Sequence, residues 1–188
     1  FNKFSLLPGL IDDDVLQSVQ ALPGIQSIDE TVSNINIRGG SNDQNLILWD
    51  DIKMYQSGHF FGLISMFNPQ ITRRVQLIKN GSSVSETDGV SGTISMKTDE
   101  YLNYDTKGSG GLNLIDFNGS VDTPIGKRAS IQFATRRSLS DFVETPTFTN
   151  YFDRAIQDTE IGRNFESIPS SDLDFNFYDV SMRLLYDP

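Results

Sequence analysis

The 188-residue chain lacks cysteine and contains a single histidine, His59. Disulfides and thiolate metal sites are therefore excluded. The sequence also lacks a phosphate-cradling loop with its lysine and a nucleophile elbow. We accordingly predict no catalytic residues, no metal site and no cofactor, and we do not expect an enzyme. An acidic hydrolase stays open as a third alternative, although we locate no Asp/Glu pair that would serve it.

Positive charge is scarce, since 15 Lys and Arg residues face 25 Asp and Glu residues and the net charge is −10. Without a basic stripe, a surface that follows nucleic-acid phosphates is not expected. No apolar run approaches the roughly 18 residues of a membrane-spanning helix, and nothing resembles a secretory signal. The chain begins with Phe1 and ends in LLYDP, so we expect a piece of a longer protein.

Residues 12–24, DDDVLQSVQALPG, predict a short amphipathic helix. Their apolar side chains recur at helical spacing, and the Asp12–Asp14 carboxylates suit the positive end of a helix. Pro23-Gly24 would end it. We predict capping rather than calcium binding for the three aspartates, because no spaced acidic loop follows them.

Short strands with a period of two follow the helix. A turn containing Gly39-Gly40 separates the first two, where glycine reaches positive φ without steric cost. Asn68-Pro69 predicts a single helical turn, with Asn as its cap. The predicted strands of this half are 34–38, 45–49, 73–81 and 90–98.

The second half of the chain shows longer stretches of alternation, at 115–123, 129–139 and 178–186. A half-buried strand of a soluble sandwich alternates in the same way, so the period alone leaves two interpretations open. The last stretch is the most regular, with Tyr178, Val180, Met182, Leu184 and Tyr186 alternating with Asp179, Ser181 and Arg183.

The tyrosines and the connections favour a membrane barrel. Tyr178 and Tyr186 are eight residues apart. At ~3.3 Å per residue and a tilt near 40° they stand roughly 20 Å apart along the barrel normal, close to the ~25 Å apolar band between aromatic girdles. Residues 124–128 predict a tight turn and 141–173 a long polar excursion, as in outer-membrane barrels. We therefore assign both tyrosines to membrane girdles.

Five segments, in order, resemble the plug domain of TonB-dependent outer-membrane receptors: DVLQSVQALPGI, INIRGG, LILWDDI, VQLIKNG and GVSGTISMKT. There are departures, because Asp50-Asp51 stands where Asp-Gly is usual and the TonB-binding segment is not recognisable before residue 12. The resemblance implies an α+β plug domain at 1–98, with a small mixed sheet and short helices. It implies that 99–188 supplies the first antiparallel strands of a truncated transmembrane β-barrel.

The resemblance also implies where these strands lie. A plug begins on the periplasmic side, so the turn at 124–128 is periplasmic only if an even number of barrel strands precedes it. Leu112 and Leu114 alternate in one register, whereas Ile115, Phe117 and Val121 alternate in a register shifted by one residue. Such a shift indicates a hairpin between Leu114 and Ile115. The expected strands lie near 108–114, 116–123, 129–140 and 174–187.

The resemblance also implies roles for arginines and glycines of the plug. Family members hold the plug through arginine–glutamate contacts, which implies ion pairs from Arg38, Arg73 and Arg74 to barrel carboxylates. A solvated Arg38 is the alternative. Gly39 and Gly40 would let the backbone bend tightly and pack close to the barrel wall.

The segment YQSGHFF, residues 55–61, is predicted to be a plug apex that contacts the ligand through Tyr55, His59, Phe60 and Phe61. Aromatic side chains and a titratable histidine at a loop tip suit a polar solute with apolar faces. In the alternative interpretation the two phenylalanines pack inward and His59 is a hydrogen-bonded loop residue.

The function implied by the resemblance is transport across the outer membrane of a Gram-negative cell, with the plug inside the barrel and the N-terminus periplasmic. The partners would be TonB, through a segment upstream of this chain, outer-membrane lipid, and a small external ligand such as a siderophore, cobalamin, glycan or peptide. The alternative is a soluble periplasmic or surface α+β binding or adhesion module with a β-sandwich tail. That module would require Val180, Met182 and Leu184 to face a protein core.

Overall fold

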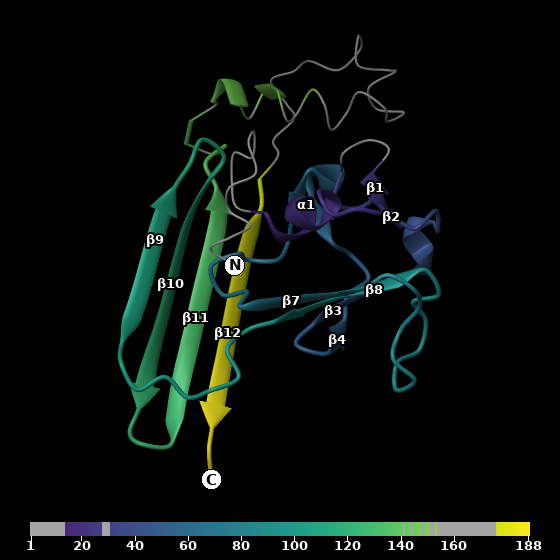
Figure 1. Ribbon diagram of the computed structural model, residues 1–188. Coiled ribbons are helices and arrows are strands. Elements are labelled where there is room, and N and C mark those ends of the chain that lie inside the picture. The colour runs from purple at the N-terminus through teal and green to yellow at the C-terminus, as the bar shows by residue number, and fades with distance from the viewer. Residues whose placement is uncertain are drawn as a thin grey trace. The chain divides into compact units, whose positions relative to one another are not determined.

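The computed structural model describes residues 14–27, 31–140, 142–143, 145–147, 149–150, 153 and 176–188 (Figure 1). The chain divides into two compact units, Phe1–Tyr101 and Leu102–Pro188. Across the described ranges, no helix combines the length and the apolar character needed to cross a membrane.

Helix α1 (Val15–Gln20) opens the described part of the first unit and is shorter than predicted. Its N-cap is Asp14, whose side chain accepts hydrogen bonds from the backbone N–H groups of Leu16 and Gln17 at 2.8 and 3.0 Å. The predicted capping role is thus confirmed for Asp14, while the two preceding aspartates lie outside the described residues. The chain turns at Gly24, which has a φ of 81°.

The largest sheet of the first unit is mixed and has the strand order β4-β3-β8-β7. β8 runs parallel to β3 and antiparallel to β7, and β4 forms a hairpin with β3. The predicted strands are confirmed with shifted or shortened ends. The bounds are β3 (Asn45–Trp49), β4 (Ile52–Lys53), β7 (Arg74–Ile78) and β8 (Gly92–Lys97).

Two antiparallel strand pairs complete this unit. They are β1 (Ile25–Ser27) with β2 (Ile35–Ile37), and β5 (Gly58–His59) with β6 (Ile64–Ser65). Single 3-10 turns precede β3 and join β5 to β6, namely η1 (Asn42–Gln44) and η2 (Phe60–Gly62).

The core of the first unit lies where α1 meets the strands. The partly buried Trp49 stacks on Phe67 with ring centroids 5.3 Å apart. Full burial of one large apolar side chain stabilises a fold by about 1.5–3 kcal/mol, so this cluster holds the helix to the sheets. Its buried members are Val15, Leu16, Val19, Ile25, Val32, Ile35, Ile37, Ile47, Phe67, Ile94 and Met96.

The helical turn predicted at Asn68-Pro69 is a hydrogen-bonded turn instead. The Oδ1 atom of Asn68 accepts from the backbone N–H of Gln70, and its carbonyl oxygen accepts from Thr72 Oγ1, both at 2.9 Å. The backbone N–H of Arg73 already donates to Lys97 in the sheet. Too few residues therefore remain for a helix, although Asn68 still acts as the cap.

The second unit is a four-stranded antiparallel sheet with the order β12-β11-β10-β9. The hairpin predicted from the phase slip is present, since Leu112 pairs with Phe117. The tight turn is present as well, with Ile125 paired to Ala129 and a φ of 68° at Gly126. The excursion at 141–173 falls largely outside the described residues. The strands are β9 (Lys107–Leu112), β10 (Asp116–Ile125), β11 (Ala129–Ser138) and β12 (Tyr178–Tyr186).

The register gives this sheet one apolar and one polar face. On β12 the side chains of Tyr178, Val180, Met182, Leu184 and Tyr186 are 59–75% exposed. Across the strand pair, Met182 lies opposite Phe133 and Leu184 opposite Ile131. The polar residues of β12 pair instead with Arg136, Ala134 and Gln132 of β11. The exposed face of the sheet is therefore its apolar one.

Candidate functional site

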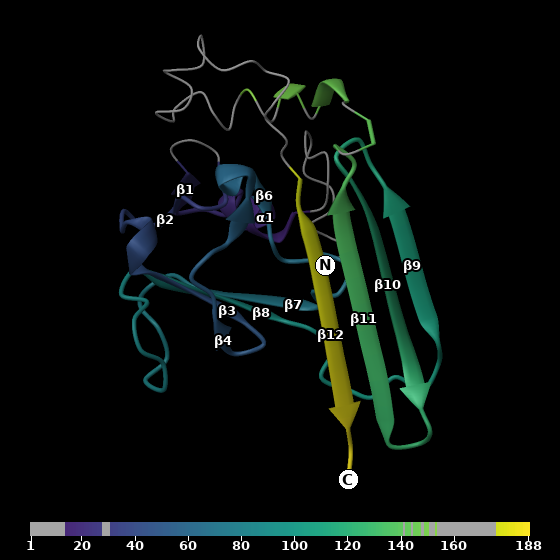
Figure 2. The same cartoon turned by 180° about the vertical axis from the view of Figure 1, so that it is seen from behind.

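The predicted ligand-facing segment forms part of a small hairpin and not a free loop. Gly58 pairs with Ser65 and His59 with Ile64, and η2 joins the two strands. Figure 2 shows β6 of this hairpin beside α1. The backbone N–H of Met66 donates to the carbonyl of Ser57 at 2.9 Å and extends the pairing by one step.

Tyr55 lies immediately before the hairpin and is 89% exposed. The Nζ atom of Lys53 stands 5.0 Å from the centre of the Tyr55 ring and also pairs with the carboxylate of Asp88. A cation–π contact at an exposed site contributes about 0.5–1 kcal/mol. Lys53 therefore restrains an aromatic ring that stays open to solvent, as a ligand contact requires. Lys53 and Asp88 were not predicted, since they lie 35 residues apart in sequence.

The other predicted apex residues differ from Tyr55. His59 is half-buried in β5. Phe60 is only 8% exposed and has a φ of 49°, so its ring packs inward, as the alternative interpretation anticipated. A left-handed backbone costs a non-glycine residue about 1–2 kcal/mol, which tertiary packing must offset. The side chain of Phe61 lies outside the described part of the structure. Ligand contact by these residues stays a prediction.

Two glycines set the tight shape of the hairpin. A Cβ atom on Gly58 would lie 2.8 Å from both Gly62 Cα and Val32 Cγ2. Gly62 has a φ of 93°, and its carbonyl accepts the backbone N–H of Val32 at 2.6 Å. Side chains at Gly58 and Gly62 would collide with Val32 and Ser33 respectively and would force the hairpin away from residues 32–33.

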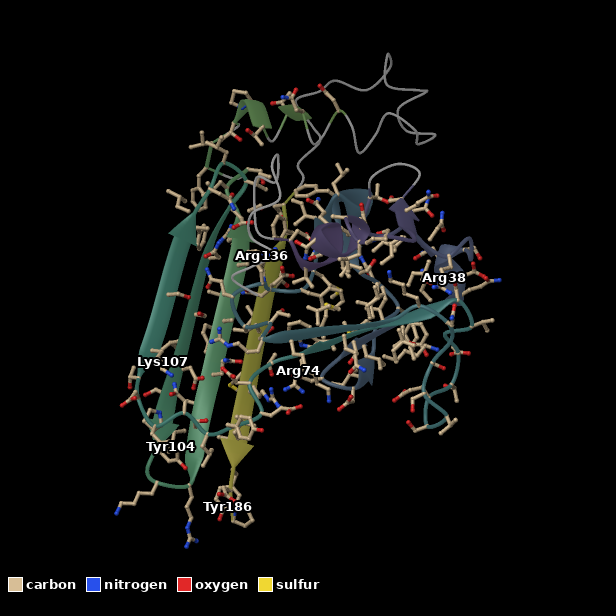
Figure 3. The ribbon with its side chains drawn as sticks, in the orientation of Figure 1. Arg38, Arg74, Tyr104, Lys107, Arg136 and Tyr186 are labelled. Atoms are coloured by element: carbon tan, nitrogen blue, oxygen red, sulfur yellow. The ribbon has the colours of Figure 1, made fainter. Side chains whose placement is uncertain are left out.

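The three predicted pairing arginines lie apart. Arg38 Nη1 donates to Asn80 Oδ1 at 2.9 Å, and Arg73 Nε pairs with Asp99 at 2.9 Å. Arg74 is exposed, and no side-chain partner is found for it within the described ranges. Arg74 begins β7 and Asn80 follows its end, so Arg38 and Arg74 lie toward opposite ends of that strand (Figure 3). Pairing with barrel carboxylates stays a prediction.

The turn after Arg38 uses its two glycines for different reasons. Gly39 has a φ of 83° and open space where a Cβ would be. Gly40 packs so closely on Ser91 that a Cβ would collide with that side chain. Arg38 itself has a φ of 50°. The predicted tight turn is thus present; Gly40 packs against Ser91 of the same unit, and its close packing on a barrel wall stays a prediction.

The hairpin between β3 and β4 contains a network that the sequence pattern did not indicate. Asp50 and Asp51 both have positive φ, 47° and 66°, as a two-residue hairpin turn of the primed type requires. The backbone N–H and Oγ1 of Thr98 donate to the two carboxylate oxygens of Asp50, each at 2.8 Å. Lys97 pairs with Asp51. The end of β8 is thereby fixed to the β3–β4 turn.

The pKa of Lys97 is raised above its ordinary value of 10.5. The hydrogen bond of Lys97 to Asp51 is the largest cause of this rise. The negative charges of Asp51, Glu100 and Asp50 also raise the pKa, whereas partial burial of Lys97 lowers it. The Asp50-Asp51 pair in place of Asp-Gly marks the turn as unusual, but nothing in the local pattern selects Lys97 or Thr98 as its partner.

Comparison with known families agrees with this architecture. Residues 11–93 match the family model described as the TonB-dependent receptor plug domain. These residues form a TonB-dependent receptor plug domain. The predicted fold class is confirmed with it: an α+β plug domain followed by antiparallel strands of an unclosed barrel.

Solved structures similar to the chain include the FrpB iron transporter from Neisseria meningitidis in two forms. The F3-3 variant has 16% identity and a TM-score of 0.46, with 66% of this chain and 21% of that chain covered. The F5-1 variant in its apoprotein form has 18% identity, a TM-score of 0.46 and the same coverage. The chain thus spans about a fifth of their length. No curated protein matches the sequence.

Beyond the plug domain, the second unit carries the predicted girdle residues at the two ends of β12. Tyr178 is 75% and Tyr186 65% exposed. Figure 3 shows Tyr104 near the same end of the sheet as Tyr186, and Tyr104 is 70% exposed. Tyr104 precedes β9 and so carries no alternation signal in the sequence; a girdle role for the three tyrosines stays a prediction.

The polar face of the second unit contains a buried ion pair. Arg136 donates from Nε and Nη2 to Asp179 Oδ2 at 3.0 and 2.7 Å. Its guanidinium group also lies over the ring of Phe177, 5.3 Å from the ring centre, and Arg136 is 1% exposed.

In the parts of the chain that the structure describes, no cluster of three or more His, Asp or Glu side chains could hold a metal ion.

Proposed function

We propose that this chain is part of a TonB-dependent transport receptor of the outer membrane. The observation that carries the proposal is the combination of a plug domain with strands whose apolar face is exposed. The apolar side chains of β12 are 59–75% exposed and begin and end with tyrosine. An apolar band bounded by aromatic residues suits the hydrocarbon layer of a membrane.

The transport cycle would use the plug as its moving part. A small external ligand, whether siderophore, cobalamin, glycan or peptide, would bind on the outer side of the plug. TonB would engage a segment upstream of this chain, by strand addition, and pull on it. The plug would then shift and the ligand would pass to the periplasm. Because TonB relays energy from the inner membrane, the receptor itself would need no nucleotide site.

Within the plug we assign ligand contact first to Tyr55 and then to His59. Tyr55 is the most accessible of the predicted apex residues for which an exposure is known, at 89%. Among the arginines we assign contact with the barrel wall first to Arg74, because Arg38 and Arg73 already have partners within the unit. A charge enclosed by the barrel without a partner would be costly, so Arg74 requires a carboxylate there.

The test is the behaviour of the native full-length product. We expect a protein several times longer than this chain that fractionates with the outer membrane, is released only by detergent, and can be cross-linked to TonB in cells. A product that is soluble without detergent would overturn the proposal and would favour the adhesion module with a sandwich tail.

A further inference from the structure

The sequence contains two Asn-Gly pairs, Asn80-Gly81 and Asn118-Gly119. Because glycine has no Cβ atom to shield its backbone nitrogen, that nitrogen can attack the side-chain amide of the asparagine before it. In a folded chain the reaction depends on how the structure holds the nitrogen and the amide. The two pairs lie in different surroundings, so each is the internal comparison for the other.

The pair Asn118-Gly119 lies within a sheet. Both residues are half-buried in β10, and Gly119 is paired with Gly110 on one side and with Thr135 on the other. A strand with neighbours on both sides engages its backbone N–H groups in the ladders. The nitrogen of Gly119 is therefore held in the sheet and cannot approach the side chain of Asn118 unless the sheet opens.

The pair Asn80-Gly81 lies directly after β7, outside the sheet. Asn80 is exposed, and Gly81 has a φ of 77° with no atom closer than 3.8 Å to the place of a Cβ. The backbone N–H of Gly81 donates to the carbonyl of Ser91 at 3.4 Å, longer than the roughly 2.7–3.2 Å of an ordinary hydrogen bond. The attacking nitrogen is thus accessible and only weakly engaged.

Arg38 contacts the amide that would be attacked. Its Nη1 atom donates to Asn80 Oδ1 at 2.9 Å, across 42 residues of sequence. The backbone of Arg38 is itself held, since its N–H group donates to the carbonyl of Gly24 at 2.9 Å. When the nitrogen of Gly81 attacks, Oδ1 gains negative charge. A cationic donor already placed on that oxygen stabilises the charge, as the donors of an oxyanion hole do.

We propose that Asn80 is a site of spontaneous deamidation, which Arg38 activates toward attack by Gly81. The nitrogen of Gly81 forms a bond to Asn80 Cγ and gives its proton to water. The bond from Cγ to Nδ2 breaks, and the departing NH₂ group takes a proton from water and leaves as ammonia. Water then opens the cyclic imide. Attack at Cγ yields aspartate, and attack at the main-chain carbonyl yields isoaspartate.

The reaction changes the partner of Arg38. Both products have a carboxylate in place of the neutral amide, and isoaspartate also lengthens the main chain after β7 by one carbon atom. Aspartate at position 80 converts the hydrogen bond from Arg38 into an exposed ion pair. The barrel carboxylates predicted to pair with Arg38 would then have a competitor within the plug. This chemistry needs neither transport nor a membrane, so it is independent of the proposed function.

The test follows both asparagines in the folded full-length receptor, incubated at neutral pH. Peptide mapping by mass spectrometry detects the exchange of NH₂ for OH and separates aspartate from isoaspartate. We expect Asn80 to convert at least about tenfold faster than Asn118, because Asn118 reacts only after a backbone hydrogen bond of Gly119 breaks. In urea, which removes both the sheet and the contact with Arg38, the two rates should be similar. Equal rates in the folded receptor would overturn the proposal.

The variant Arg38→Met separates activation of Asn80 from mere restraint. If Arg38 only restrains the side chain, its loss frees Asn80 and conversion becomes faster. Activation predicts the opposite, a conversion roughly tenfold slower in the folded receptor and unchanged in urea. Arg38→Lys keeps a cationic donor and should convert faster than Arg38→Met. Faster or unchanged conversion in Arg38→Met would overturn the role of Arg38.

The matched control for the lost charge is Lys127→Met. Lys127 is exposed in the turn between β10 and β11, so this variant removes one positive charge from the surface without touching the contact between Arg38 and Asn80. We expect its rate at Asn80 to equal that of the wild type. A decrease equal to that of Arg38→Met would show that net charge sets the rate, and would overturn activation by Arg38.

Discussion

Replacing Met182 by arginine would place a charge in the middle of the exposed apolar face of β12. Met182 is 73% exposed and lies four residues from each predicted girdle tyrosine, Tyr178 and Tyr186. At about 3.4 Å per residue and a strand tilt of about 40°, each tyrosine is roughly 10 Å from Met182 along the membrane normal. Met182 would therefore lie near the midplane of the hydrocarbon layer.

The depth of the substituted residue in the hydrocarbon layer determines how much the arginine lowers the free energy of unfolding. Arginine on the lipid face of a barrel costs roughly 2–4 kcal/mol at the midplane and about 0–1 kcal/mol near the interfaces. We expect Met182→Arg to lower the free energy of unfolding by the larger amount. Tyr186→Arg, at the rim, should cost clearly less. Met182→Leu controls for the loss of methionine packing against Phe133 across the strand pair and should cost under about 1.5 kcal/mol.

The assay is reversible urea unfolding of the full-length receptor in phospholipid vesicles, with folded protein detected by its heat-modifiable migration on gels. The order of the three variants in urea concentration at unfolding shows whether β12 crosses the hydrocarbon layer. If Met182→Arg unfolds at the same urea concentration as Met182→Leu, or as Tyr186→Arg, then β12 does not cross the hydrocarbon layer in the way argued and the membrane assignment of this face is wrong.

Other tests address the plug. Gly58→Ala should destabilise it by about 1–3 kcal/mol through overpacking, seen as a lower chemical-denaturation midpoint, and an unchanged midpoint would refute the tight hairpin. Asp50→Ala removes the acceptor of both Thr98 hydrogen bonds and should cost about 1–3 kcal/mol, with faster hydrogen exchange at Thr98 as its specific readout. The ion pair of Lys97 with Asp51 should stabilise the plug fully below pH 10.5 and be lost as the pH rises through the raised folded-state pKa of Lys97. The difference in midpoint between wild type and Lys97→Met should accordingly vanish at high pH, and a difference that persists there would contradict this assignment.

The features predicted correctly from the sequence depend on local signals. Strict alternation gives β12 its two faces, and a phase slip between Leu114 and Ile115 marks the first hairpin. Asn113 explains that slip physically, since its Oδ1 atom accepts the backbone N–H groups of Ile115 and Asp116, each at 2.7 Å. A side-chain turn of this kind needs only neighbouring residues, so it leaves a mark in the sequence.

The features that the sequence did not reveal depend on distant residues. Capping by Asp14 was predictable from its position before an apolar run, but its bond to Ser65 spans 51 residues. The bond from Thr98 to Asp50 spans 48 residues. Nothing in the local pattern of either partner selects the other. Such contacts follow from the parallel pairing of β3 with β8 and the docking of α1 on β6, which only the folded chain provides.

The ion pair of Arg136 with Asp179 shows what such a distant contact can accomplish. The tight turn at 126–128 fixes the register of β10 against β11, but the connection from β11 to β12 is too long to do so. A slip of one residue would move Arg136 opposite Tyr178 or Val180 on the apolar face and leave its charge without Asp179. Breaking a buried pair costs about 3–5 kcal/mol, far more than one cross-strand contact contributes. The buried pair, with Phe177 beneath the guanidinium group, therefore selects the register that keeps the whole apolar face of β12 on the exposed side of the sheet.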